Sequence, residues 1–146
     1  MTKAPDPGRA IEKYRRRARG YDASAHRTMD LRRRVVGMLG LSVGDAVLDV
    51  ACGTGLSLPL LAAAVGSAGR VIGVEVSPDM IQLARERAAR DELANVTLIE
   101  ASMEEAVFTG LLDAVLFNYT HDVLQSPRAL RNIFSGATSR SPGSRS

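Results

Sequence analysis

The chain has 146 residues, enough for one domain with a hydrophobic core, and its apolar (45%) and charged (24%) fractions are those of an ordinary globular protein. No apolar run approaches the roughly 18 residues of a membrane-spanning helix, and the charged start lacks the apolar core of a secretory signal. The single cysteine, Cys52, excludes an internal disulfide and favours a reducing compartment, so we expect a cytoplasmic protein without a membrane partner.

The net charge of +3 is unevenly distributed along the chain. Residues 1–34 hold 11 Lys and Arg against 4 Asp and Glu, whereas residues 35–146 hold 8 against 12. A basic segment can bind nucleic acid, but RNA-binding surfaces place stacking aromatic residues beside the basic ones, and only Tyr14 and Tyr21 lie nearby. We therefore interpret residues 1–34 as a basic helical segment and expect no nucleic-acid partner.

Apolar periodicity and turn residues predict alternating helices and strands. Helices are expected over residues 8–19, 28–39, 55–65, 77–90 and 126–134, and strands over residues 46–50, 70–76, 96–100 and 113–118. The core face of the second helix is expected to carry Leu31, Val35, Met38 and Leu39. Strands rich in Val, Ile and Leu that alternate with helices indicate an α/β fold, a doubly wound Rossmann-like sheet that is mostly parallel.

The stretch VLDVACGTG, residues 47–55, ends the first predicted strand in a turn. Gly53 and Gly55 allow a tight turn and let a ligand approach the main chain closely. Glu75 ends the second predicted strand, where a carboxylate can accept hydrogen bonds from two ribose hydroxyls. Ligands of such sheets bind beyond the carboxyl ends of the strands, so this pattern favours a ligand that contains a nucleoside.

Two ligand classes share these features, the nicotinamide dinucleotides and S-adenosylmethionine. The dinucleotide fingerprint requires a small residue three positions after the second glycine, and this chain has Leu58 there. Asp49 lies inside the motif, where its carboxylate would repel a diphosphate but could order the loop or engage an ammonium group. The residues therefore favour S-adenosylmethionine.

Four stretches, VLDVACGTG, VIGVEVSPDMIQLARERA, NVTLIEASMEEAVF and LLDAVLFNYTHDVL, resemble the successive motifs of class I S-adenosylmethionine-dependent methyltransferases. The resemblance covers about residues 35–134, which we take as the cofactor-binding domain. It implies a doubly wound fold, S-adenosyl-L-methionine as cofactor and no metal. The cofactor-binding residues that it implies are Asp49, Ala51, Gly53 and Gly55 in the first motif, Glu75 at the ribose, Met80, Ser102 and Met103 around the adenine, Asn118 and Tyr119 beside the methionine part, and Tyr14 and Tyr21 closing over the cofactor.

Two of these positions depart from the family's usual pattern. Ala51 replaces a common glycine, which is a small change. Ser102 stands where many members have an acid that reads the adenine amino group, and a serine hydroxyl accepts such a bond more weakly.

The resemblance implies methyl transfer to an acceptor, which we expect to be a small molecule. Such an enzyme must mainly align the acceptor with the methyl group and exclude water. His121, just past the fourth predicted strand, is the candidate base because histidine titrates near neutral pH. A loop histidine that caps a turn or faces solvent is the competing interpretation.

The last twelve residues, 135–146, include five serines and no Val, Ile, Leu or Phe, which predicts a disordered tail. The family pattern continues with a glycine-rich turn and further strands, so we expect truncation after the fourth strand, as a frameshift or early stop would produce. A native short ending is the alternative. The fourth strand would then be an exposed edge, through which the chain could self-associate.

Three functional hypotheses follow. The first is a methyltransferase that could be inactive through truncation. The second is a non-catalytic remnant or partner-dependent module that binds an adenosyl ligand. The third is a fragment of a nicotinamide-dependent oxidoreductase, which Leu58 disfavours.

Overall fold

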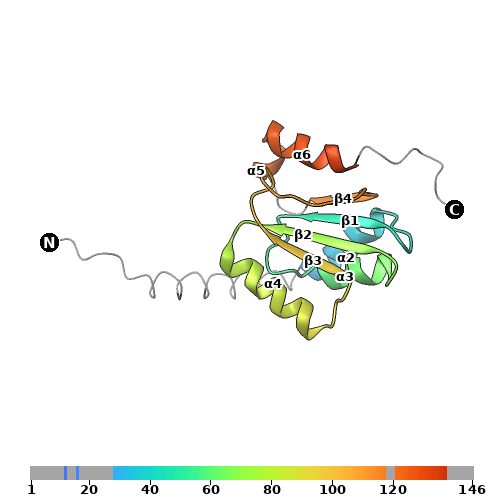
Figure 1. The fold of residues 1–146 in the computed structure, drawn as a ribbon. Helices are drawn as coiled ribbons and strands as arrows, with labels where there is room; N and C mark the ends of the chain where they lie inside the picture. The colour runs from blue at the N-terminus through green and yellow to red at the C-terminus, as the bar shows by residue number, and fades with distance from the viewer. Residues whose placement is uncertain (1–11, 13–15, 17–27, 118–120, 138–146) are drawn as a thin grey trace.

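The structure, a computed structural model, describes residues 12, 16, 28–117 and 121–137 (Figure 1). Its helices are α2 (Met29–Met38), α3 (Leu58–Val65), α4 (Pro78–Arg90), α5 (His121–Leu124) and α6 (Pro127–Ala137). Its strands are β1 (Ala46–Val50), β2 (Arg70–Glu75), β3 (Val96–Glu100) and β4 (Ala114–Phe117). The site candidates that lie outside the described residues are Tyr14, Tyr21, Asn118 and Tyr119.

The described strands form one sheet in the order β3-β2-β1-β4, and every neighbouring pair is parallel. The chain winds from β1 outward to β3 and then returns to place β4 on the other side of β1. The winding therefore reverses between β1 and β4, and ligands of doubly wound sheets bind at such a point. The predicted Rossmann-like parallel sheet is confirmed.

Helices cover both faces of the sheet, with α4 and α6 on opposite sides (Figure 1). Val47 of β1 belongs to the cluster that includes side chains of α2, α3 and α4. Its neighbour Leu48 belongs to the second cluster, together with Ala129 and Ile133 of α6. Because successive strand residues point to opposite faces, Asp49 shares the face of Val47, beside α2 and α3.

The buried face of α2 differs from the predicted one. Leu31 and Met38 are 51% and 85% exposed, whereas Arg32 and Val36 are buried. Val35 and Leu39 are partly buried and pack against the core, as predicted. The helix therefore presents one face, which includes Arg32 and Val36 in place of Leu31 and Met38. Periodicity misplaced one side of this face because it counted Arg32 as a surface residue, although an arginine stem can cover apolar surface.

Other elements differ from the predictions at their ends. The third helix begins at Leu58 rather than at residue 55, because Gly55 has a φ of +84° that no right-handed helix contains. The short α5 was not predicted. Helix α6 continues to Ala137, three residues into the segment 135–146 for which composition predicted disorder.

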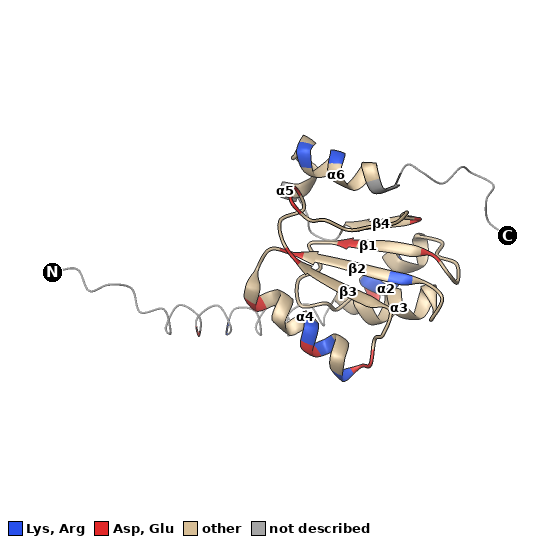
Figure 2. Ribbon diagram, viewed as in Figure 1, with Lys and Arg blue, Asp and Glu red and all other residues tan. Residues whose placement is uncertain are grey.

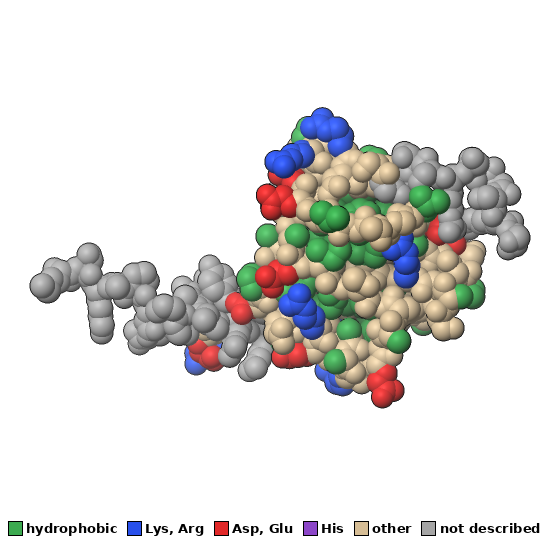
Figure 3. All heavy atoms as spheres, viewed as in Figure 1, with side chains coloured by type: hydrophobic (Ala, Val, Ile, Leu, Met, Phe, Trp, Pro, Cys, Tyr) green, Lys and Arg blue, Asp and Glu red, His purple; other side chains and the backbone are tan. Residues whose placement is uncertain are grey.

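Basic residues lie on α2, α4 and α6, and acidic residues lie on β1 and at the end of β2 (Figure 2). On the face drawn in Figure 3, apolar side chains gather between these charged groups. None of the helices in the described part of the chain is both long and apolar enough to cross a membrane.

Candidate functional site

The loop that joins β1 to α3, residues 51–57, is the centre of the site and is called the glycine loop below. Its backbone is left-handed at three alternate positions, with φ values of +54° at Ala51, +60° at Gly53 and +84° at Gly55. Glycine adopts this region without strain, and alanine does so at a cost. The common family glycine replaced by Ala51 therefore stands at a position where glycine is the less strained residue.

Glu75, the last residue of β2, fixes this loop. Its side chain is buried, with 7% of the residue exposed. Oε1 accepts the backbone N–H of Gly53 at 3.0 Å, and Oε2 accepts the backbone N–H of Ser77 at 2.9 Å. The carboxylate thus joins the glycine loop to the start of α4, and each oxygen retains a lone pair for a further donor.

Two arginines that the sequence analysis did not single out also hold the glycine loop. Arg87 of α4 donates from Nε to the carbonyl oxygen of Thr54 at 3.1 Å. Arg32 of α2 donates from a guanidinium nitrogen to Oγ of Ser57 at 3.1 Å. Each bond links the loop to a helix, so α2 and α4 both fix its position. Periodicity gave no signal for either, because both look like surface residues in a helix.

Close packing under the loop depends on two glycines. A Cβ at Gly55 would lie 2.7 Å from Cδ1 of Leu58 and 3.2 Å from Cβ of Ala84. A Cβ at Gly73 of β2 would lie 3.1 Å from Sγ of Cys52, the buried cysteine of the loop. The space beside Gly55 is therefore filled by the protein core. A larger residue there would therefore disturb the packing of the fold itself.

Asp49 lies at the base of the loop and is only 2% exposed. Its Oδ2 atom has no hydrogen-bond partner among the described residues. Burial raises the pKa of its carboxyl from 3.8 to about 7, while the positive charge of Arg32 opposes the rise and the negative charge of Glu75 adds to it. The charge of Asp49 therefore changes near neutral pH. Burial, followed by the charges of Asp49 and Glu75, also raises the pKa of the Cys52 thiol.

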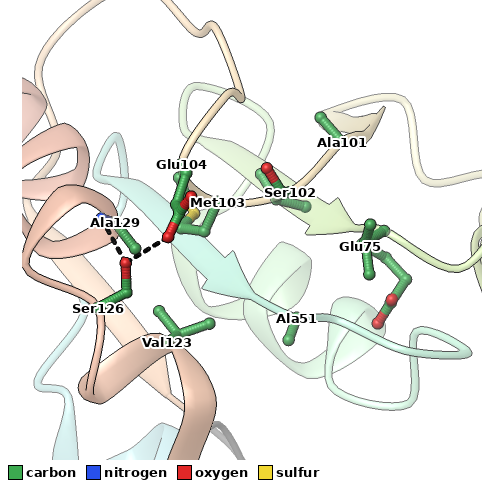
Figure 4. Close-up of a pocket in the computed structure, with 11 residues that line it drawn as sticks. Ala51, Glu75, Ala101, Ser102, Met103, Glu104, Val123, Ser126 and Ala129 are labelled. Atoms are coloured by element: carbon green, nitrogen blue, oxygen red, sulfur yellow. Dashed lines mark hydrogen bonds between the residues drawn. The ribbon is translucent and has the colours of Figure 1, made fainter.

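A pocket of about 190 Å³ opens at the carboxyl ends of β2 and β3 (Figure 4). Its described lining consists of Ala51, Val74, Glu75, Val76, Ala101, Ser102, Met103, Glu104, Val123, Ser126 and Ala129. Four predicted site residues, Ala51, Glu75, Ser102 and Met103, are thus brought together. The other described candidates, Asp49, Gly53, Gly55 and Met80, are not in this lining, although Gly53 is bonded to Glu75.

Helix α6 closes the far wall of this pocket. Ser126 donates from Oγ to Oε1 of Glu104 at 2.5 Å and accepts the N–H of Ala129 at 3.1 Å, as Figure 4 shows. Asn132 donates to the carbonyl oxygens of Met103 and Ala106 at 2.8 and 2.9 Å. The segment after β3 is therefore fastened to α6. Sequence reasoning used Ser126 only as the start of a helix and missed Glu104 and Asn132.

His121, the candidate base, is the first residue of α5 and follows β4 after residues 118–120, which lie outside the described part of the chain. Its backbone stands near the carboxyl end of the sheet, since β4 ends at Phe117. The proposed role of its side chain stays a prediction.

Comparison with known proteins relates the chain to methyltransferases. The demethylmenaquinone methyltransferase of Symbiobacterium thermophilum is 32% identical over 125 residues, which cover 80% of this chain and 50% of that protein. The aklanonic acid methyltransferase DauC of Streptomyces sp. strain C5 is 36% identical over 89 residues, or 60% of this chain and 40% of that protein. The 23S rRNA (uracil(1939)-C(5))-methyltransferase RlmD of Acinetobacter baylyi is 53% identical over 60 residues, or 40% of this chain and 13% of that protein. The chain thus spans half the length or less of these curated relatives.

A solved structure shares the fold along most of the chain. A SAM-dependent methyltransferase from Aquifex aeolicus superposes with a TM-score of 0.70 at 27% identity, covering 92% of this chain and 68% of that one. Residues 47–138, which run from the second residue of β1 to just beyond α6, match the family described as the methyltransferase domain. The chain therefore belongs to the methyltransferase domain family.

Proposed function

We propose that the chain binds S-adenosyl-L-methionine at the carboxyl ends of β1, β2 and β3 and takes part in methyl transfer to a small-molecule acceptor. The observation that carries the proposal is the placement of Glu75. Its buried carboxylate ends β2, fixes the glycine loop through Gly53 and lines the pocket that Ser102 and Met103 also line. A fixed carboxylate between a glycine loop and an apolar pocket suits a ribose with an adenine beyond it.

The charge of the pocket supports this ligand over a dinucleotide. The described lining holds two carboxylates, Glu75 and Glu104, and no Lys or Arg. A diphosphate bound there would face negative charge without compensation, whereas the cationic methionine part of the adenosyl ligand would not. The buried Asp49, with an unpartnered oxygen beneath the loop, adds to the same preference.

Each group would have a limited task in the reaction. When bound, the cofactor supplies an activated methyl group on a sulfonium. Glu75 would accept the ribose hydroxyls, Ser102 would accept the adenine amino group, and the glycine loop would lie against the methionine part. His121 is proposed as a base near the acceptor. The main contribution of the protein is to orient the two reactants and exclude water.

The proposal of a small-molecule acceptor rests on the names of the relatives that this chain matches. The demethylmenaquinone methyltransferase of Symbiobacterium thermophilum matches 125 residues of the chain, whereas the matches to rRNA methyltransferases cover 60 and 91 residues. A relative named for aklanonic acid, a second small molecule, matches 89 residues. We therefore propose a small molecule rather than RNA, and a cytoplasmic setting on the evidence of the single Cys52.

Titration calorimetry with S-adenosylhomocysteine and with NADH tests the proposal. Binding of the first ligand alone is expected. Binding of NADH alone, or of neither ligand, would reject the adenosyl site. A methylation assay with demethylmenaquinone-like and polyketide acceptors then separates an active methyltransferase from a binding module, because only the former consumes the cofactor.

We also propose that the chain self-associates through β4. Among the described residues β4 pairs only with β1, so its other edge offers unpaired backbone groups to a second strand. Sedimentation velocity at two protein concentrations tests this. A dimer that increases with concentration is expected, and a monomer at both concentrations would contradict it.

A further inference from the structure

Arg32 of helix α2 is a charged residue in a buried position, and contacts within the helix do not account for its burial. It is 6% exposed, and its guanidinium group donates a hydrogen bond to Ser57, the residue before α3. The neighbouring Arg33 is instead exposed and pairs with Asp30 at 2.9 Å on the surface of the same helix. Burying a guanidinium costs free energy unless charge and hydrogen bonds compensate it, so a buried arginine next to an exposed one requires an explanation.

Ser57 supplies part of that explanation. It precedes the first residue of α3, where a serine side chain commonly caps the helix, but its side chain makes no such cap. Its hydroxyl instead accepts the hydrogen bond from Arg32 at 3.1 Å. The last residue of the glycine loop is therefore attached to α2.

Asp49 supplies the compensating charge. It lies on the face of β1 that α2 and α3 cover, and its Oδ2 is buried without a partner among the described residues. Arg32 is the positive group that acts on it from α2, while Glu75 acts on it from β2 and Cys52 follows it in the glycine loop. Arg32 thus opposes both the burial of Asp49 and the like charge of Glu75.

We propose that Arg32 is a positioning residue of the cofactor site, which holds the glycine loop through Ser57 and favours the charged form of Asp49 beneath that loop. The proposal rests on the proposed function, because the ligand in question is the adenosyl cofactor. The position of helix α2 would thereby affect the cofactor site. If Arg32 moves away, the glycine loop loses its hydrogen bond to α2, and the pKa of Asp49 rises further. A protonated Asp49 offers less attraction to the ammonium group of the ligand, which S-adenosylmethionine and S-adenosylhomocysteine both carry.

Four variants separate the two tasks. Arg32→Gln removes the charge and the hydrogen-bonding fork, Arg32→Lys keeps the charge, and Ser57→Ala removes only the acceptor. Arg33→Gln is the matched control, because it changes the adjacent arginine, which is exposed. Affinity for S-adenosylhomocysteine is measured by calorimetry between about pH 6 and 9, the range around the pKa of Asp49.

The wild type and Arg33→Gln are expected to bind more tightly as the pH rises through about 7. In Arg32→Gln this rise should move to higher pH by about one unit, so that binding at pH 7 weakens by about fivefold. Arg32→Lys should show the same pH profile as the wild type. Ser57→Ala should weaken binding but leave the pH at which the affinity rises unchanged. A purely structural role would lower affinity equally at every pH, and that result, or an unchanged Arg32→Gln, would overturn the proposal.

A measurement without ligand keeps this test independent of the proposed function. The carboxyl carbon of Asp49, followed by NMR in the free protein, should titrate at higher pH in Arg32→Gln than in Arg33→Gln. An unchanged titration would refute the coupling of Arg32 to Asp49 even if the ligand binds. A shifted titration together with no ligand binding to the wild type would instead reject the adenosyl site and leave the coupling intact.

Discussion

Glu75 accepts the backbone N–H of Gly53 at 3.0 Å, so the acid at the end of β2 fixes the loop that leaves β1. A second oxygen of the same carboxylate accepts the N–H of Ser77, which begins the turn into α4. The residue proposed to bind the ribose is therefore held in position before any ligand arrives. Such preorganisation lowers the cost of ordering the side chain on binding.

Replacing Glu75 by alanine should weaken binding of S-adenosylhomocysteine by about 1.5–3 kcal/mol, the range for hydrogen bonds to a charged group. The same change frees the N–H groups of Gly53 and Ser77, so a modest loss of stability should accompany it. Calorimetry gives the affinity and denaturant unfolding gives the stability of each variant.

Glu100→Gln is the control for this experiment. Glu100 ends β3, in register with Glu75, but its side chain is 43% exposed and lies 3.8 Å from Arg85. It should leave the affinity unchanged. Normal binding by a folded Glu75→Ala protein would show that the ribose does not lie against β2.

Gly55→Ala should destabilise the fold by about 1–3 kcal/mol, the range for an overpacked core, whether or not ligand is present. The added Cβ would approach Leu58 to 2.7 Å, and the φ of +84° strains any L side chain. Gly37→Ala is the contrast, because nothing lies within 4 Å of that position in α2. It should stabilise the helix by about 0.5–1 kcal/mol. Equal melting temperatures for both variants would contradict the packing found at Gly55.

The strands could be predicted because each is a short, continuous apolar run that ends in turn residues. Strands β1 and β3 have the predicted bounds, and β2 and β4 differ from prediction only at their ends. Ser77 likewise caps α4 as expected, accepting the N–H of Met80 at 3.4 Å. In both cases the signal is local, since neighbouring residues alone determine it.

The buried arginine and the far wall of the pocket could not be predicted, because they depend on contacts between distant segments. Arg32 meets Ser57 across 25 residues, and Glu104 meets Ser126 across 22. Neither contact leaves a periodic pattern, and a lone Arg or Glu in a helix or turn is typical of a surface. The resemblance to methyltransferases indicated which residues line the pocket. It did not indicate which side chains form the hydrogen bonds between the segments around it.

The stability of the fold should fall as the pH rises from about 4 to about 7, because the folded protein holds a proton on Asp49 that the unfolded chain has lost. The stabilisation from the neutral carboxyl is full below 3.8, the ordinary pKa of the group, and is lost as the pH rises through about 7. The slope from this group is at most about 1.4 kcal/mol per pH unit.

Asp49→Asn should remove that slope, whereas Asp30→Asn, which changes a side chain that is 92% exposed, should retain it. Urea unfolding at several pH values between these limits measures the slope for each protein. A slope that persists in Asp49→Asn would assign the pH dependence to another group.

Ser102→Asp should tighten binding of S-adenosylhomocysteine, because a carboxylate accepts a hydrogen bond from the adenine amino group more strongly than a hydroxyl does. Ser102 lines the pocket together with Glu104, whose Oε1 already accepts from Ser126, so the new acid would be the acceptor closer to Glu75 (Figure 4). The expected gain is about 1 kcal/mol, or roughly fivefold in affinity. Ser102→Ala should lose a smaller amount. The decisive comparison uses the inosine analogue of the ligand, which lacks the amino group: Ser102→Asp should increase the preference for the adenosine form, and an unchanged preference would mean that residue 102 does not face the adenine.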